Sequence, residues 1–350
     1  MNKSHLYLLS LILFGAIIRI WNFWGDCFHC DELFTYNLAQ KSIPEILAYT
    51  LNNDCNPPLF YLIDHFSLLV FGLNSFATRF PSIMFGILLI PAVYYLGKEI
   101  DGELTGLLSA TIITTLGSMW YYSQFARSYM LLCLLITILC IYWVRISRGN
   151  NEVYTWLTFS IVSAVSIWAH LFALIPVSLM FVYLLSKYRT TALKWASMSV
   201  LLCLPLLGLG YQIILNRGDG TGQVDHWPTI WELIYTSPLE FWGYGFIFIL
   251  GLVIYSQYKK SNPLIIGACL VFGAELLLSK ITPVFPRYSL FLVPILCVVA
   301  MIPVSQFLTN EDATKAQRWF VFLFVTVFYY ATIILQFTTV YFLPKGQFCI

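Results

Sequence analysis

The chain has 350 residues, of which 59% are hydrophobic, 17% are aromatic and only 10% are charged, and its mean hydropathy is +0.78. These values exclude a water-soluble globular domain of ordinary composition. The net charge of +2 gives no reason to expect a nucleic-acid partner. We therefore expect an integral membrane protein in contact with membrane lipids.

Apolar runs recur along the whole sequence. A hydrocarbon core of about 30 Å needs roughly 20 apolar residues per helix. The runs lack the alternating pattern of a membrane β-barrel, which favours an all-α polytopic membrane protein. Twelve runs are candidates: 6–24, 57–73, 80–97, 104–121, 126–144, 154–170, 171–187, 192–214, 241–257, 264–279, 286–307 and 319–342.

The first run resembles a secretory signal in its position. However, it is long, contains Arg19 and lacks a small-x-small cleavage site. These features favour a helix that is retained in the mature protein.

The second run, 57–73, is short and carries Asp64 and His65 at its middle, where ionisable side chains are costly in lipid. If this run does not cross, eleven basic residues are cytoplasmic and eight are external, as the positive-inside rule expects. A crossing reverses that bias. We therefore predict eleven spanning helices, with 57–73 as an external interfacial or re-entrant helix. Twelve crossings are the alternative.

The first external loop, residues 25–73, opens with "GDCFHCDELFTYNLAQ". Its first part, 25–56, holds five acids and one base, Lys41. Apolar residues recur at helical spacing between residues 32 and 50, which predicts short helices on the membrane surface. Such helices hold Asp31 and Glu32 at the boundary between water and lipid. The simpler alternative is that the acids only keep an external loop hydrated.

Two further features on the expected outer side could take part in binding or catalysis. Pro57 and Pro58 mark a sharp entry into the following helix. Arg79, Arg127 and Arg287 lie at or near the outer ends of helices, and arginine matches phosphate oxygens bidentately. For each single arginine, the alternative is an extension of the side chain toward lipid headgroups.

Cysteines near the acidic loop raise the question of a metal or a disulfide. Cys27 and Cys30, with His29 and Cys55, form an incomplete zinc ligand set. On an oxidising face a disulfide among these three cysteines is an equal alternative, and unpaired thiols are a third. A divalent cation at Asp31, Glu32 or His65 stays open, but we predict no essential metal or other cofactor.

Six stretches in this order resemble the GT-C superfamily of membrane glycosyltransferases. More narrowly, they are similar to the bacterial and archaeal relatives of dolichyl-phosphate-mannose protein mannosyltransferases and of the lipid A aminoarabinose transferase. The resemblance covers roughly residues 10–305. The stretches are "CDELFTYNLAQKS", "DCNPPLFYLIDHF", "FGLNSFATRFPSIMFG", "YYSQFARSYMLL", "WAHLFAL" and "FPRYSLFLVP".

The resemblance implies that the chain transfers a sugar from a polyprenyl-phosphate donor to an acceptor hydroxyl, with the Asp-Glu pair at Asp31 and Glu32 carrying catalysis. This sequence departs from the family pattern at Asn56, where many relatives have His, and at Phe125, where many have an acid. The matching pocket positions are Asp54, Asn56, His65, Tyr129, His170 and Tyr288.

Chemical reasoning assigns roles within that pattern. Asp31 is expected to act as the general base, and Glu32 to orient the acceptor or to hold Asp31 through a shared network. Arg127, Arg287 and Arg79 are expected to stabilise the phosphate as it leaves. The charges are thus expected to be sorted, with the acids where the acceptor arrives and the arginines where the phosphate lies.

The chain is expected to form one transmembrane domain over residues 1–350, with no soluble C-terminal domain. The expected location is the plasma membrane of a prokaryote, with the site facing outward and a lipid, glycan or protein as acceptor. A transporter and a catalytically inactive relative are the alternatives. The former is disfavoured because polar residues gather at one face and the two halves do not repeat.

Overall fold

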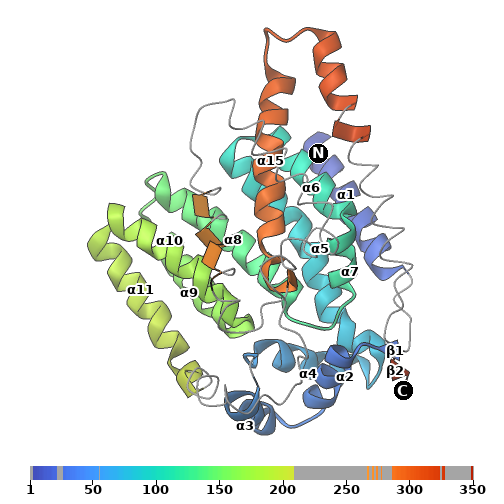
Figure 1. Ribbon diagram of the computed structural model, residues 1–350, viewed down its shortest axis with the longest axis vertical. Coiled ribbons are helices and arrows are strands. Elements are labelled where there is room, and N and C mark those ends of the chain that lie inside the picture. The colour runs from blue at the N-terminus through green and yellow to red at the C-terminus, as the bar shows by residue number, and fades with distance from the viewer. Residues whose placement is uncertain are drawn as a thin grey trace.

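The computed structural model describes residues 3–21, 27–54, 56–208, 286–323, 325–327 and 348–349, with scattered positions between 266 and 277 (Figure 1). Within these ranges the protein is helical apart from one short antiparallel strand pair, β1 (Cys27–Phe28) with β2 (Phe348–Cys349). The helices are α1 (Lys3–Ile20), α2 (Cys30–Ala39), α3 (Ile43–Asn53), α4 (Leu59–Phe71), α5 (Ser75–Ile100), α6 (Glu103–Thr115), α7 (Gly117–Ser123), α8 (Tyr129–Ser147), α9 (Val153–Ala169), α10 (Leu174–Lys187), α11 (Arg189–Cys203) and α15 (Leu292–Thr309), with 3-10 turns η1 (Leu171–Ala173), η2 (Leu204–Leu206) and η4 (Pro286–Ser289).

Four helices in the described part of the chain are long and apolar enough to cross a membrane: α1, α5, α8 and α15. The chain is a multi-pass membrane protein, and its described part is helical apart from β1 and β2. Of the eleven crossings predicted from the sequence, the run at 241–257 lies outside the described residues. The runs at 192–214, 264–279 and 319–342 lie partly outside them.

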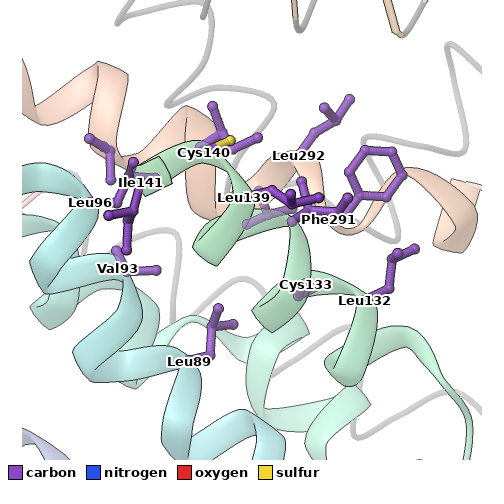
Figure 2. Packing of buried hydrophobic residues seen from close by; sticks show 14 of the residues in the cluster. Leu89, Val93, Leu96, Leu132, Cys133, Leu139, Cys140, Ile141, Phe291 and Leu292 are labelled. Carbon is purple, nitrogen blue, oxygen red and sulfur yellow. The ribbon is translucent and has the colours of Figure 1, made fainter. Parts of the chain in front are cut away.

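The core lies where α5, α8 and α15 pack together (Figure 2). Leu89 and Val93 of α5, Cys133 and Leu139 of α8, and Leu292 of α15 are all buried there. Lipid tails are as apolar as these side chains, so close packing, more than exclusion of water, has to stabilise the contact. The three helices therefore form a fixed frame for the ends that carry the site.

Helices α5 and α6 are in close contact at two glycines. A Cβ atom built on Gly97 lies 2.8 Å from the Cα atom of Gly106, and one built on Gly106 lies 2.5 Å from the carbonyl oxygen of Tyr94. Only hydrogen fits at either position without moving backbone. Small residues that bring helix backbones together are a common basis of helix packing in membranes.

Arg19, near the end of α1, is completely buried, and its guanidinium hydrogen bonds connect α1 to α6 and α7. It donates to the carbonyl oxygens of Ile113 and Thr114, each at 3.0 Å, and to the hydroxyl of Ser123 at 3.1 Å. The two carbonyls belong to the last turn of α6, where helix carbonyls lack helical partners. Arg19 thus fixes the break between α6 and α7 that leads into the site.

Helices α2, α3 and α4 lie together across one end of the bundle, where α1 finishes and α5 begins (Figure 1). The structure therefore has short helices within residues 25–73, where the apolar spacing predicts them, and the external position of this loop stays a prediction. Helix α4 has 13 residues, which is about 20 Å of helix and short of a hydrocarbon core of about 30 Å. Its length agrees with the prediction that 57–73 does not cross.

The glycine contact predicts a specific loss of stability. Gly97→Ala forces a methyl group against the backbone of Gly106, so we expect the free energy of unfolding to fall by about 1–3 kcal/mol. Thermal unfolding in lipid measures the change. Gly208→Ala is the matched control, because a Cβ atom there meets nothing within 4 Å. Equal melting temperatures for the two variants would contradict the packing argument.

Candidate active site

The amino-terminal end of α2 fixes the two neighbouring acids. His29 precedes the helix, its Nδ1 atom accepts a hydrogen bond from the backbone N–H of Asp31 (3.3 Å), and its own N–H donates to Glu32 (3.0 Å). This reciprocal arrangement is a capping box, and acids in a first helical turn also interact favourably with the helix dipole. Because Asp31 and Glu32 are consecutive in a helix, their side chains point in different directions.

Glu32 forms a buried ion pair with Arg79 of α5. Nε and Nη2 of Arg79 donate to the two carboxylate oxygens at 2.8 and 2.9 Å, and the backbone N–H of Ala126 adds a third hydrogen bond at 3.1 Å. Glu32 and Arg79 are only 3% and 8% exposed. The pair connects α2, α5 and the loop 124–128. Acceptor binding by Glu32 and phosphate binding by Arg79 stay predictions, and this geometry favours a structural role for both.

Asp31 lies between two arginines. Its Oδ1 atom is 3.3 Å from Nη2 of Arg127, and its Oδ2 atom is 3.4 Å from Nη2 of Arg287. Arg127 belongs to the loop 124–128 between α7 and α8, whereas Arg287 belongs to η4. The acid expected to meet the acceptor and the arginines expected to bind the phosphate therefore lie in contact, and the sorting of their roles stays a prediction. The fold brings residues from three distant parts of the chain together because the first external loop packs across the bundle end.

The loop that carries Arg127 is held at three points. Gln124 donates to the carbonyl oxygen of Arg19 at 2.9 Å, Ala126 donates to Glu32, and the carbonyl oxygen of Arg127 accepts from Ser82 of α5 at 3.2 Å. These bonds fix the loop backbone against α1, α2 and α5. The guanidinium of Arg127 therefore extends from a rigid support.

Tyr61 of α4 holds the other side of the Arg127 side chain. Nη1 of Arg127 donates to the Tyr61 hydroxyl at 2.9 Å, and that hydroxyl donates to Oδ2 of Asp54 at 2.7 Å. Arg127 also lies over the ring of Phe34, 5.6 Å from its centroid. Burial lowers the pKa of Arg127, but Tyr61 and Asp31 outweigh burial, so the pKa lies above its ordinary value and the guanidinium is permanently charged.

Asp54 and Asn56 form the turn that leads into α4. Oδ1 of Asp54 accepts from both the backbone N–H and the side-chain amide of Asn56, at 3.1 and 3.2 Å. Pro58 then stands as the N-cap of α4. The other carboxylate oxygen of Asp54, Oδ2, accepts the hydrogen bond from the hydroxyl of Tyr61 in the first turn of α4. Sequence reasoning named Asp54 and Asn56 but missed Tyr61; the signal for it was an aromatic residue three positions after Pro58 in a helix with one buried face.

Three aromatic rings stand next to the two arginines. The His170 ring is 6.1 Å from Tyr129 and 5.3 Å from Tyr288, centroid to centroid. Nδ1 of His170 accepts from the backbone N–H of Phe172 at 3.2 Å, which places the proton of the neutral ring on Nε2. Burial, then the charges of Arg127 and Arg287, lower the pKa of His170 to about 4. His170 is therefore neutral at physiological pH.

His65 lies apart from this group. Its Nδ1 atom is 2.8 Å from the carbonyl oxygen of Ala39, at the carboxyl end of α2, whereas Asp31 is at the amino end. The expected grouping of His65 with the pocket residues is therefore not what the structure shows. The hydrogen bond instead connects α4 to α2.

Asp64, on the same helix, is completely buried, and neither of its carboxyl oxygens has a hydrogen-bond partner among the described residues. Burial, and then the negative charge of Glu32, raise the pKa of Asp64 from 3.8 to about 8. The carboxyl group is thus protonated at neutral pH.

Within the described residues no group of three or more His, Cys, Asp or Glu side chains is arranged to hold a metal ion. Cys30 is an exposed free thiol. The side chain of Cys27 and all of Cys55 lie outside the described residues. The prediction of no essential metal and the state of these cysteines are therefore left as predictions.

Comparison with known proteins shows which fold the chain shares. Residues 55–209 match the family model described as dolichyl-phosphate-mannose-protein mannosyltransferase. The apo oligosaccharyltransferase of Archaeoglobus fulgidus superposes with a TM-score of 0.67 at 13% identity, over 96% of this chain and 56% of that one. ArnT from Cupriavidus metallidurans bound to undecaprenyl phosphate superposes with a TM-score of 0.65 at 13% identity, over 93% of this chain and 64% of that one.

The chain has the fold of the GT-C glycosyltransferases. The resemblance expected from the six sequence stretches is confirmed. No curated protein matches the chain. The chain spans between about half and two-thirds of the length of the two structures.

The buried ion pair predicts a large effect on stability. Arg79→Met leaves the Glu32 carboxylate buried without its partner, which costs about 3–5 kcal/mol of unfolding free energy. Arg145→Met is the control: Arg145 pairs with Glu99 at 2.9 Å, but both side chains are partly exposed, so its loss costs about 1 kcal/mol or less. Thermal unfolding compares the two, and similar losses would contradict the assignment.

Burial of Asp64 predicts that Asp64→Asn stabilises the protein relative to wild type, and that the gain grows with pH. Because the carboxyl group keeps its proton in the folded state up to about pH 8 but ionises at lower pH when unfolded, the wild type loses stability as pH rises between these values. Asp64→Asn removes that loss, so its melting temperature relative to wild type should rise from pH 5 to pH 8.

The control for this experiment is Asp101→Asn. Asp101 accepts hydrogen bonds from Thr105 and Gln306, each at 2.7 Å, so its replacement should bring no gain that grows with pH. A difference between Asp64→Asn and wild type that stays constant with pH would contradict the burial argument.

Proposed function

We propose that this protein transfers a sugar from a polyprenyl-phosphate-linked donor to an acceptor hydroxyl at the outer face of the membrane. The single observation that carries the proposal is the position of Asp31, a partly exposed carboxylate placed directly beside Arg127 and Arg287. A base and two permanent positive charges at one point are what a transfer from a phosphate leaving group requires.

In the proposed reaction Asp31 takes the proton of the acceptor hydroxyl as its oxygen bonds to the anomeric carbon of the sugar. The bond between that carbon and the phosphate oxygen breaks, and its electron pair leaves with the polyprenyl phosphate. A phosphate monoester has a second pKa of about 6 and needs no general acid to depart. Arg127 and Arg287 stabilise the charge that grows on its oxygens.

The neutral imidazole of His170 suits the wall of such a site. Its Nε2 proton is available to a sugar hydroxyl or a phosphate oxygen, and the ring adds no third positive charge beside the two arginines. Tyr129 and Tyr288 complete an aromatic surface of the kind on which sugar rings pack.

Two further observations support the lipid-linked donor and its side of the membrane. ArnT, which has the same fold, was crystallised with undecaprenyl phosphate. The distribution of lysine and arginine favours the outer side of the membrane for residues 25–73, and with them for Asp31. A prokaryotic plasma membrane, and a lipid, glycan or protein as acceptor, complete the proposal.

The test is the release of polyprenyl phosphate from labelled polyprenyl-phosphate sugars by the full chain in lipid, with cell-envelope extract as acceptor. Asp31→Asn keeps the shape of the side chain but removes the base, so we expect transfer to fall at least about 100-fold. Glu103→Gln makes the same change of charge at a surface pair and should leave transfer unchanged.

Either of two results would count against the proposal. Transfer that survives in Asp31→Asn would remove the base from its assigned role. Absence of release by well-folded wild type with every donor in the panel would favour a transporter or an inactive relative.

A further inference from the structure

The two neighbouring acids of α2 are held by arginine in different ways. Glu32 makes two hydrogen bonds to Arg79 at 2.8 and 2.9 Å inside the protein. Asp31 approaches its two arginines only to 3.3 and 3.4 Å, and its side chain is 27% exposed. Charge-assisted hydrogen bonds are about 2.7–2.9 Å long. Glu32 is therefore a permanent partner, whereas Asp31 is held loosely and can be replaced.

Arg127 has a second support that does not depend on Asp31. Tyr61 is 2% exposed and packs in a cluster with Leu38 and Ile46, so its ring is fixed. Because its hydroxyl proton points to Asp54, the oxygen presents a lone pair to Arg127. Tyr61, backed by Asp54, thus holds the guanidinium in place whether or not Asp31 is there.

The position of the Asp31 carboxylate suits a phosphate group. A carboxylate and a phosphate offer similarly spaced oxygens to a guanidinium. Phosphate offers more of them, and Arg127 has a donor to spare, because its buried Nε atom has no hydrogen-bond acceptor in the described part of the chain. Two anions repel each other at this range, so the carboxylate and the phosphate cannot share the position.

We propose that the carboxylate of Asp31 holds the place of the donor phosphate between Arg127 and Arg287 and leaves it when the phosphate binds, while Tyr61 and Asp54 keep Arg127 in position. The inference rests on the proposed function and adds a regulation of the same site. In the resting protein both arginines engage the oxygens of Asp31. Donor binding releases them, so the base becomes available only when a sugar is ready for transfer.

The exchange predicts that removal of a negative charge tightens binding only for a ligand that carries phosphate. The measurement is the binding of polyprenyl phosphate, and of polyprenol as the phosphate-free probe, to the full chain in lipid nanodiscs. Asp31→Asn no longer competes for the arginines, so we expect polyprenyl phosphate to bind about tenfold more tightly. Polyprenol should bind as to wild type, and Glu103→Gln should change neither affinity.

Tyr61→Phe should have the opposite effect. It keeps the ring in its cluster but removes the oxygen that orients Arg127, so we expect polyprenyl phosphate to bind roughly five- to tenfold more weakly. Binding of polyprenol and the melting temperature should not change. In transfer assays the variant should raise the KM for the donor and leave the KM for the acceptor as it is. A purely structural role would weaken binding of both probes.

The outcomes separate the exchange from the function on which it rests. Equal or weaker binding of polyprenyl phosphate by Asp31→Asn, when wild type prefers it to polyprenol, would overturn the exchange and leave the transferase proposal standing. Weakening of both probes by Tyr61→Phe would overturn its positioning role. A wild-type protein with no preference between the probes would overturn both the exchange and the proposed donor.

Discussion

The buried pair between Glu32 and Arg79 is the interaction on which the rest of the site depends. It lies where the first external loop meets α5, and its third hydrogen bond, from Ala126, extends it to the loop between α7 and α8. Burying two charges is costly, and only short, two-point contact with additional hydrogen bonds compensates for that cost. The pair fixes α2 in orientation and so determines where the neighbouring Asp31 lies.

The site therefore has a tightly bonded part and a loosely held part. Glu32, Arg79, Asp54 and Tyr61 form short hydrogen bonds within the protein and define the positions of the charges. Asp31 is partly exposed and lies 3.3 and 3.4 Å from its two arginines. This division suits the proposed transfer, in which the phosphate-binding groups are held still while the proposed base changes partners.

Sequence reasoning predicted the helical membrane class, the short helices of the first external loop, and the family resemblance. These follow from local signals: long apolar runs, helical spacing and ordered motifs. It also singled out Asp31, Arg127 and Arg287, which the structure brings together. It did not predict that they contact one another, because contacts between residues so distant in the chain depend on how α2 packs against the bundle, and periodicity carries no information about that packing.

The sequence motif also does not show that its two acids, Asp31 and Glu32, make different contacts. Asp31 and Glu32 stand side by side in the chain and share one chemistry, so nothing in the sequence distinguishes them. The difference arises from the helix, whose turn of about 100° per residue sends one side chain toward α5 and the other toward the arginines. Tyr61 was overlooked for a related reason, because an apolar helix such as α4 contains several aromatic residues and only the fold decides which one faces Asp54.

The pairing of β1 with β2 constrains how many times the chain crosses the membrane. Cys27 and Phe28 belong to the first external loop, and the backbone of Phe348 and Cys349 lies in register beside them. Both segments are thus on one side of the membrane, opposite to the start of α1. A path that starts on one side and reaches the other at its far end makes an odd number of crossings. An odd number agrees with the predicted eleven crossings, and the count itself stays a prediction because several of the runs lie outside the described residues.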